Sequence, residues 1–224
     1  MVEKIQSHGE ISLAHYGVLF LDEVTEFYKN TLELLREPLE DRQVTISRLN
    51  ASITYPCNFM LIASMNPCPC GYYGSKEKEC CCRPEQIKRY QSKISGPLLD
   101  RIDIQVEVNG VKYDKLQSDE KIESSEQIRE RVNQARKIQI ERYKNFNIYS
   151  NSELTPKLIE KFCKLDMECQ KILELAFEKL GLSARAYGRI LKVARTIADL
   201  DNSENIQKKH LAEAIQYRTL DRKI

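Results

Sequence analysis

The sequence predicts an α/β domain followed by an all-α region, and two observations carry this prediction. Residues 1 to about 107 contain short apolar runs separated by turns, with a helical pattern among them, which is typical of strands and helices in alternation. From about Tyr113 onward, apolar residues recur at helical spacing instead. We therefore expect an α/β domain over 1–107, a linker over 108–122 and a helical domain over 123–224.

Five runs in the first domain predict strands, because they are short, apolar and bounded by polar or turn residues. They are VLFL at 18–21, VTIS at 44–47, ASITY at 51–55, FMLIAS at 59–64 and IDIQVEV at 102–108. The first run is apolar throughout, which indicates a parallel strand buried on both faces. Between the first two runs, Phe27, Leu32, Leu35 and Leu39 recur at near-helical spacing and predict a helix.

Helix signals are clear in the second domain. Ser124 and Gln127 have the spacing of a capping box at the start of a helix that runs to about Tyr143. Gly181 follows an amphipathic stretch and indicates its C-cap. Two more helices are predicted at about 184–199 and 207–218, so this half is expected to be a small helical bundle.

Composition excludes several classes of protein. The chain has 224 residues, of which 42% are hydrophobic and 30% charged, as in soluble globular proteins. A net charge of +2 gives no global case for a polyanionic partner, so nucleic-acid binding has to rest on local patches. No apolar run approaches the roughly 20 residues that span a bilayer, and we expect a cytoplasmic protein. In that reducing compartment, clustered cysteines indicate metal binding rather than disulfides.

The run at 18–21 ends in two acids, Asp22 and Glu23, which is the pattern of a Walker B element. One carboxylate would help to hold Mg²⁺ and the other would orient and deprotonate the attacking water. An acidic helix start is the alternative interpretation. The usual companion motif, G-x-x-x-x-G-K-S/T, is absent, because no glycine of the chain starts such a phosphate loop.

Two further residues fit phosphate chemistry. Asn66 follows the apolar run at 59–64, where a polar amide would sense a γ-phosphate at the carboxyl edge of the sheet. Arg101, in SGPLLDRID, has the planar, permanently charged group that stabilises a transferring phosphoryl. The alternatives are a turn-forming asparagine before Pro67 and a surface salt bridge.

Four cysteines form two close pairs, C-P-C at Cys68 and Cys70 and C-x-C at Cys80 and Cys82. Two thiolate pairs on a loop poor in apolar residues favour a closed tetrahedral zinc site. Cys81, which lies inside the second pair, and a free-thiol state are the alternatives. The remaining cysteines are expected to be buried thiols.

The segment RQVTISRLNASITY predicts a β-hairpin with Leu49 and Asn50 at its turn. Arg42, Arg48 and nearby hydroxyl groups would be able to contact a phosphate backbone. An ordinary edge hairpin is the alternative.

Several long strings together resemble the magnesium-chelatase-like AAA+ proteins of the ComM/YifB type, over nearly the whole chain. They are GEISLAHYGVLFLDE, LLREPLEDRQVTISR, NPCPCGYYG, RYQSKISGPLLDRID and LSARAYGRILKVARTIADL with HLAEAIQYR. The resemblance implies a partial AAA+ P-loop NTPase core, with a parallel sheet whose first strands are missing, followed by an all-α helical lid. It also implies ATP and Mg²⁺ as cofactors and a homo-oligomeric ring, expected to be a hexamer. Its expected partner is single-stranded or branched DNA, since the type includes branch migration in natural transformation and recombination.

The resemblance also assigns roles to individual residues. Asp22 corresponds to the Walker B magnesium-site acid and Glu23 to the catalytic glutamate. Asn66 falls at sensor 1, and Arg101 at the arginine finger that acts on the neighbouring subunit's nucleotide. Arg48 and Arg42 would contact DNA, because in related ring helicases a hairpin before sensor 1 faces the pore.

Sensor 2 is expected at Arg185, in LSARAYGR, with Arg189 as the reserve candidate. Independently of the resemblance, one side of this helix is basic, with Lys192 and Arg195 continuing the row. A solvated basic face is the alternative interpretation.

The largest departure from the family is the absent phosphate loop, which we expect upstream of residue 1. The isolated chain is therefore expected not to hydrolyse ATP and to bind it weakly at best, with unpaired sheet edges. Two other functions remain open. One is a magnesium chelatase motor that remodels a partner protein, and the other is a non-catalytic, zinc-stabilised module for binding or oligomerisation.

Overall fold

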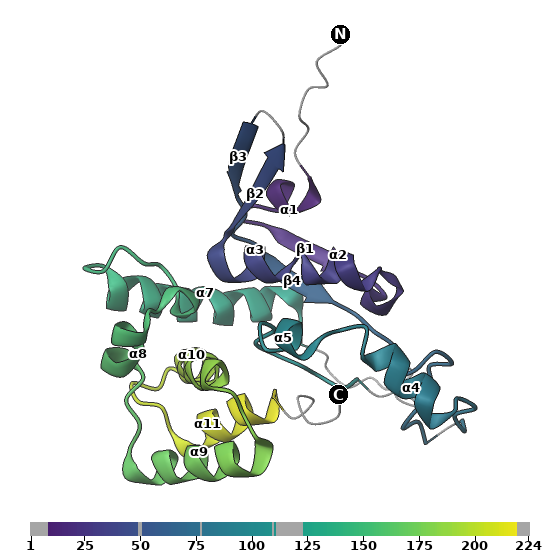
Figure 1. Cartoon of the computed structure of the whole chain (residues 1–224). Coiled ribbons are helices and arrows are strands. Elements are labelled where there is room, and N and C mark those ends of the chain that lie inside the picture. Colours follow the sequence, from purple (N-terminus) through teal and green to yellow (C-terminus); the bar gives the residue numbers. More distant parts are fainter. Residues whose placement is uncertain (1–8, 49–50, 77, 109, 111–122, 219–224) are drawn as a thin grey trace. The chain divides into compact units, whose positions relative to one another are not determined.

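Residues 9–48, 51–76, 78–108, 110 and 123–218 are described by a computed structural model. The backbone divides into two units, residues 1–102 and 103–223 (Figure 1), and each is described by itself. Most of the expected linker lies outside the described residues, so the domain boundaries stated above stay predictions.

Two parallel strands form the sheet of the first unit. β1 (Val18–Leu21) pairs with β4 (Met60–Ala63) in a register that sets Leu21 opposite Ala63. The parallel pairing expected for these two runs is confirmed. Because parallel strands end at the same edge, the residues that follow β1 and β4 emerge side by side.

The expectation that β1 is buried on both faces is wrong. Leu19 and Leu21 pack against the apolar core of the unit, whereas Val18 and Phe20 are 55% and 58% exposed. Met60 and Ile62 of β4 are exposed as well. Side chains of a strand alternate between its two faces, and within the described part of the chain apolar packing covers only one of them.

The helices of this unit are short, and residues from several of them pack with Leu19 and Leu21 in the apolar core. These helices are α1 (Glu10–Leu13), the 3₁₀ turn η1 (Val24–Glu26), α2 (Lys29–Glu33), α3 (Arg36–Asp41), α4 (Pro84–Gln91) and α5 (Gly96–Leu99). The single helix expected from the leucine spacing is two helices, α2 and α3. Pro38 lies in the first turn of α3, where a missing N–H costs nothing, so it fits a new helix start better than a helix interior.

The predicted hairpin is present as β2 (Gln43–Arg48) and β3 (Ala51–Pro56), which pair antiparallel. One face carries hydroxyl groups, with Thr45 and Thr54 3.0 Å apart and Ser47 and Ser52 3.2 Å apart. Residues 49–50, which we expected at the turn, lie outside the described residues.

The strand expected at 102–108 is not formed. None of the strands that the structure describes lies beside this segment, and a run of β-formers without a partner has no ladder to join. The Gln105 N–H donates to the Tyr217 carbonyl oxygen at 3.0 Å, which is a bond to a turn and not to a strand.

The second unit is helical, as expected. Its elements are α7 (Ser125–Tyr143), η2 (Asn151–Glu153), α8 (Pro156–Phe162), α9 (Met167–Leu180), α10 (Ala184–Leu200) and α11 (Lys208–Gln216). Ser124 and Gln127 exchange both bonds of a capping box, at 3.3 and 2.9 Å. Gly181 ends α9 with φ +59°, which glycine adopts without the strain of a side chain.

A buried ionic network joins α7 to α10. Asp199 is 1% exposed and accepts hydrogen bonds from Arg142, Arg195 and Asn151. Burial alone would lower the pKa of Arg142, but the bonds to Asp199 outweigh it and raise that pKa. Arg195 is 2% exposed, so the interpretation of α10 as a solvated basic face is wrong for this residue.

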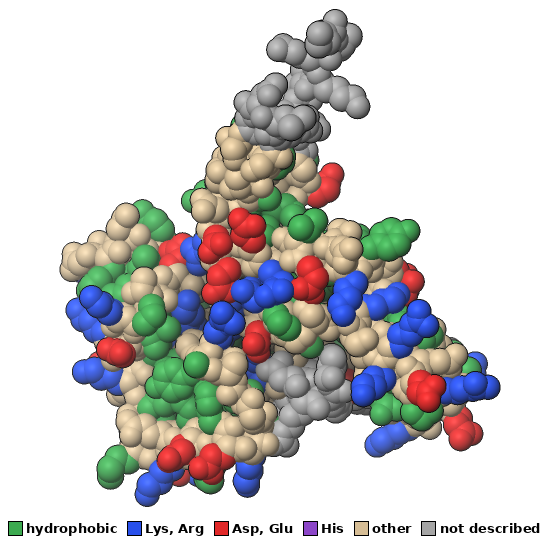
Figure 2. Space-filling view, viewed as in Figure 1, with side chains coloured by type: hydrophobic (Ala, Val, Ile, Leu, Met, Phe, Trp, Pro, Cys, Tyr) green, Lys and Arg blue, Asp and Glu red, His purple; other side chains and the backbone are tan. Residues whose placement is uncertain are grey.

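The surface gives two further observations. On the face drawn in Figure 2, basic and acidic side chains are interspersed, in keeping with the small net charge. Of the helices that the structure describes, none combines the length and apolar content needed to cross a membrane.

Candidate functional site

The acid pair lies where the register of the sheet predicts it. Asp22 and Glu23 follow β1, and Ser64 follows β4 directly opposite. Two further backbone bonds continue the ladder past the strand ends. The Ser64 N–H donates to the Leu21 carbonyl at 3.0 Å, and the Val24 N–H donates to the Ser64 carbonyl at 2.8 Å. The acids therefore sit on a well-defined backbone at the edge of the sheet.

Ser64 connects the two acids. Its hydroxyl donates to Asp22 Oδ1, and its Oγ accepts from the Glu23 N–H at 3.0 Å. The Glu23 N–H also lies 3.1 Å from Asp22 Oδ1. The sequence pattern did not single out Ser64. The parallel pairing could have indicated it, because the residue beside Asp22 has to come from the end of the neighbouring strand.

Glu23 adopts a left-handed backbone with φ +46° and ψ +52°, which is uncommon for residues other than glycine. Such strain is concentrated at functional sites, where the surroundings impose it. Its Oε1 lies 3.5 Å from Asn66 Nδ2, the long limit of a hydrogen bond. Asp22, Glu23 and Asn66 thus meet at one exposed edge, and carboxylate and amide oxygens are ligands that suit Mg²⁺.

Arg101 follows α5 and is held within its own unit. Its Nε lies 3.1 Å from Glu40 Oε2, its Nη1 donates to the Pro97 carbonyl at 2.7 Å, and its side chain is 10% exposed. The Arg101 guanidinium has to break its ion pair with Glu40 before it can contact a nucleotide held by a neighbouring subunit. The arginine-finger role stays a prediction.

Two side chains link the segment before α5 to the sheet edge that carries Asp22, Glu23 and Asn66, which we call the acid edge. Lys93 Nζ donates to the carbonyl of Thr25, two residues after Glu23. Gln91 Nε2 donates to the carbonyl of Pro67, directly after Asn66, at 3.0 Å. Hydrogen bonds therefore link the residues that follow β1 and β4 to the segment 91–93, which precedes α5 and Arg101.

The sensor-2 candidates lie near the start of α10. Arg185 is exposed, and Arg189 Nη1 forms an ion pair with Asp103 Oδ1 at 2.7 Å. Both belong to the second unit, so their relation to the acid pair stays a prediction.

The hairpin residues proposed for DNA are placed in part. Arg42 ends α3 in a left-handed conformation with φ +56° and is half-buried. Thr45 and Ser47 are exposed on one face of the hairpin. The side chain of Arg48 lies outside the described residues, and DNA contact by this element stays a prediction.

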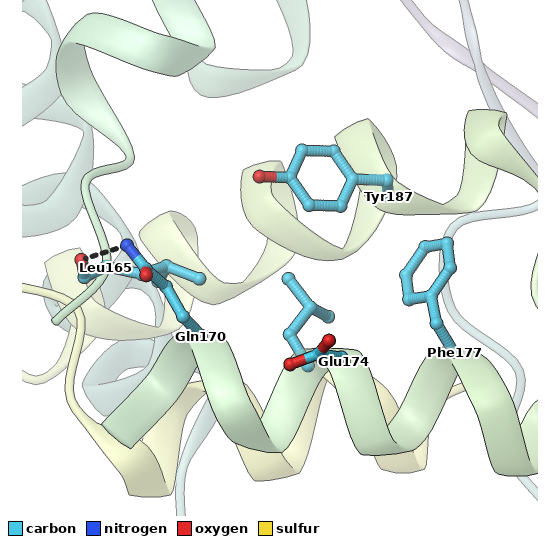
Figure 3. Close-up of a pocket in the computed structure, with 6 residues that line it drawn as sticks. Leu165, Gln170, Glu174, Phe177 and Tyr187 are labelled. Atoms are coloured by element: carbon cyan, nitrogen blue, oxygen red, sulfur yellow. Dashed lines mark hydrogen bonds between the residues drawn. The ribbon is translucent and has the colours of Figure 1, made fainter. Parts of the chain in front are cut away.

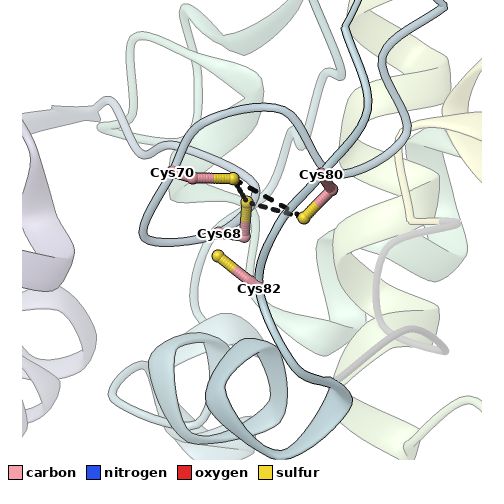
Figure 4. Close-up of side chains that lie close together, drawn as sticks. All are labelled: Cys68, Cys70, Cys80 and Cys82. Atoms are coloured by element: carbon pink, nitrogen blue, oxygen red, sulfur yellow. Dashed lines mark hydrogen bonds between the residues drawn. The ribbon is translucent and has the colours of Figure 1, made fainter.

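The four cysteines singled out by their spacing come together (Figure 4). Their Sγ atoms all lie within 4.8 Å of one another, a group able to hold a metal ion. A backbone hydrogen bond from Tyr72 lowers the pKa of Cys70 to about 5, while desolvation raises that of Cys82 to about 12. Cys81 is exposed and stands outside the group.

A cavity of about 310 Å³ opens beside α9 and α10 (Figure 3). It is lined by Leu165, Gln170, Leu173, Glu174, Phe177 and Tyr187. The rings of Phe177 and Tyr187 meet edge to face with centroids 5.9 Å apart. The lining is largely apolar and brings no set of reactive groups together, so it suggests helix packing rather than catalysis.

Two family models match almost the whole chain. The model for the magnesium chelatase subunit ChlI matches residues 3–116, and that for the C-terminal part of the same subunit matches residues 122–218.

Individual relatives agree with these models. Competence protein ComM of Haemophilus influenzae is 48% identical over 219 residues, and YifB of Escherichia coli is 47% identical over 222 residues. Each alignment covers 97% of this chain but 42% of the relative. Mb2921c of Mycobacterium bovis is 34% identical, covering 94% of this chain and 41% of that protein. The chain thus spans about two fifths of the length of these relatives, and it belongs to the magnesium-chelatase-like AAA+ family of the ComM/YifB type.

Proposed function

We propose that this chain is part of an ATP-driven ring motor that acts on DNA. One observation carries the proposal: Asp22, Glu23 and Asn66 meet at the carboxyl edge of parallel strands, with Ser64 joining the two acids. In this mechanism Glu23 would orient and deprotonate water, Asp22 would help to hold Mg²⁺, and Asn66 would contact the γ-phosphate. ATP would supply the phosphoryl group, and Mg²⁺ would neutralise the negative charge on the phosphate oxygens.

The nucleotide needs groups that these 224 residues do not contain. No phosphate loop motif occurs in the sequence, and we propose that a loop outside these residues holds the β- and γ-phosphates. Arg101 would act on the nucleotide of a neighbouring subunit in a ring, expected to be a hexamer. To do so it has to leave Glu40, 3.1 Å away. Arg185, with Arg189 in reserve, would couple the nucleotide state to movement of the helical unit.

DNA is the proposed substrate of the motor. The similarity to a protein named for competence supports this choice, and one face of the hairpin carries exposed hydroxyl groups. We propose that Arg42 and Arg48 add guanidinium groups to the same interface. Hydroxyl and guanidinium groups contact phosphates without reading sequence. Single-stranded or branched DNA would therefore be bound through its backbone.

A second candidate is the remodelling of a partner protein. The match to the family model of a magnesium chelatase subunit favours it, since a chelatase is an enzyme that inserts a metal ion. Both candidates need ATP hydrolysis. They differ in whether DNA stimulates it.

The test uses a chimera in which the N-terminal part of Haemophilus influenzae ComM, up to its match with this chain, is joined to residues 1–224. We expect ATP turnover that branched or single-stranded DNA raises several-fold, and its loss in Glu23→Gln. Glu26→Gln removes an exposed acid from the adjoining 3₁₀ turn and is the matched control. The isolated 224-residue chain is expected to show no turnover.

The outcomes separate the candidates. Turnover that DNA leaves unchanged would favour the remodelling function, and full turnover in Glu23→Gln would remove the catalytic assignment. For the hairpin, Arg48→Ala in the chimera should weaken DNA binding and reduce its salt dependence, because one phosphate contact is lost. Unchanged binding would exclude the hairpin from the DNA interface.

A further inference from the structure

We propose that Cys68, Cys70, Cys80 and Cys82 bind one zinc ion, and that this ion fixes the position of Asn66 and the start of α4. The metal site rests on the four side chains alone, so it stands whether or not the chain is part of a motor. Its structural role deepens the proposed function, because it concerns a residue of the acid edge.

The spacing of the sulfur atoms fits one tetrahedral ion. Sγ of Cys68 lies 3.4 Å from that of Cys70 and 3.7 Å from that of Cys80, and the Cys70–Cys80 distance is 3.6 Å. Zinc–sulfur bonds of about 2.3 Å set the corners of a tetrahedron about 3.8 Å apart. A disulfide would need about 2.05 Å, so the arrangement is that of ligands around a common centre.

Backbone N–H groups point at these sulfur atoms. The Tyr73 N–H donates to Cys68 Sγ at 3.3 Å, and the Tyr72 N–H donates to Cys70. Gly71 and Gly74, with φ of +81° and +80°, allow the turns that direct these amides inward. N–H groups around thiolates stabilise their negative charge, as is typical of the hydrogen bonds that surround metal ligands.

Little else in the loop would hold it in one conformation. Tyr72 and Tyr73 are 38% and 50% exposed, and Cys68 is the one fully buried side chain among the described residues of 67–83. Ordering a residue costs backbone conformational entropy, which this loop does not recover from apolar burial. A bound ion supplies the missing free energy.

The ion would join two elements of the acid edge. Cys68 follows Asn66 by two residues, and Cys82 immediately precedes Arg83, the N-cap residue of α4. Gln91, at the other end of α4, donates to the carbonyl of Pro67. An ion that holds the four sulfur atoms would therefore fix the backbone next to Asn66 and the backbone at the start of α4.

Zinc suits this site better than other metals. Four thiolates in a tetrahedron select zinc or iron, and sulfurs this close together enclose a single ion rather than an iron–sulfur cluster. Zinc does not change its redox state, which suits a site whose task is structural. A single iron ion is the chemical alternative, and the experiment distinguishes the two.

The first experiment is elemental analysis of the purified, untagged 224-residue chain. We expect about one zinc ion per chain, and the same content in Cys81→Ser, the matched control from the same tripeptide of cysteines. Cys80→Ser and Cys82→Ser should lose most of the zinc. Absence of metal, iron in place of zinc, or unchanged zinc in Cys80→Ser would each overturn the metal assignment.

The second experiment tests what the ion does. Hydrogen exchange of the zinc-loaded chain is compared with that of the chelated chain, and we expect exchange to rise over residues 64–91 after chelation. Helix α10 serves as an internal standard, so that general unfolding is recognised. Unchanged exchange at 64–76 would overturn the structural role. Neither readout depends on ATP turnover, so a failure here is distinct from a failure of the motor proposal.

Discussion

At the residue scale, Ser64 is the contact on which the geometry of the acid edge depends. Its hydroxyl bonds Asp22 Oδ1 and the Glu23 N–H, so one side chain orients a carboxylate and a strained backbone together. Hydrogen bonds to charged groups contribute about 1.5–3 kcal/mol. Ser64 is therefore a positioning residue for both acids.

We predict that Ser64→Ala lowers ATP turnover of the chimera about tenfold or more, because about 1.4 kcal/mol in a barrier is tenfold in rate. The Mg²⁺ concentration needed for half-maximal turnover should rise, which a purely structural defect would not cause. Ser64→Thr keeps the hydroxyl and should restore part of the activity. Ser92→Ala, which removes an exposed hydroxyl at the end of α4, is the control. Equal turnover in Ser64→Ala and Ser92→Ala would contradict the role.

The sequence showed some site residues and hid others. Asp22, Glu23 and Asn66 were recognisable because each follows an apolar run, and the carboxyl ends of parallel strands meet at one edge. Ser64 depends on the register between the strands, and the partner of Arg101, Glu40, is distant in sequence. Such pairings come from tertiary structure, which no local pattern encodes.

At the element scale, the N-terminus of α9 is capped by a titrating group. Asp166 Oδ1 accepts from the Cys169 N–H at 2.7 Å, and this bond lowers the pKa of the carboxyl group. A lowered pKa stabilises the folded state above the unfolded pKa of about 3.9. The stabilisation is lost as the pH falls through the folded pKa.

We predict that Asp166→Ala lowers the thermal unfolding midpoint at neutral pH, and that its difference from the unmodified chain shrinks in acid. Helical circular dichroism measured over a pH series checks this. Asp166→Asn retains an oxygen cap that does not titrate, so it should lower the midpoint less at neutral pH. A difference between Asp166→Ala and the unmodified chain that is constant down to the lowest pH would refute the role of the charged cap.

Helices were predicted better than strands. Caps such as Ser124–Gln127 and Gly181 are local, and their signals survived into the structure. The strand expected at 102–108 failed because a strand needs a neighbour, which the described residues do not offer it. The helix expected across residues 25–41 divided because Pro38 favours a helix start.

At the scale of the whole molecule, one apolar surface stands out. Val18, Phe20, Met60 and Ile62 expose their side chains on a two-stranded sheet. Exposed apolar faces and open sheet edges favour association between molecules. The isolated chain is therefore expected to associate with itself as its concentration rises.

We predict that Phe20→Thr combined with Ile62→Thr reduces this association, because threonine keeps β-propensity while removing apolar surface. Sedimentation or light scattering over a concentration series measures it. Met167→Gln removes an exposed methionine from the second unit and is the control. If the double variant associates as strongly as the control, the sheet face is not the cause.

The pairing of β1 with β4 also determines when the acid edge is formed. Asp22 and Ser64 are separated by 42 positions in the chain, and closing a long loop costs entropy before the contact returns any free energy. During synthesis the aspartate emerges first and has no partner until the serine has left the ribosome. The edge that carries Asp22 and Ser64 is consequently formed late in translation. A pause between these two codons would prolong the time in which the first strand is unpaired.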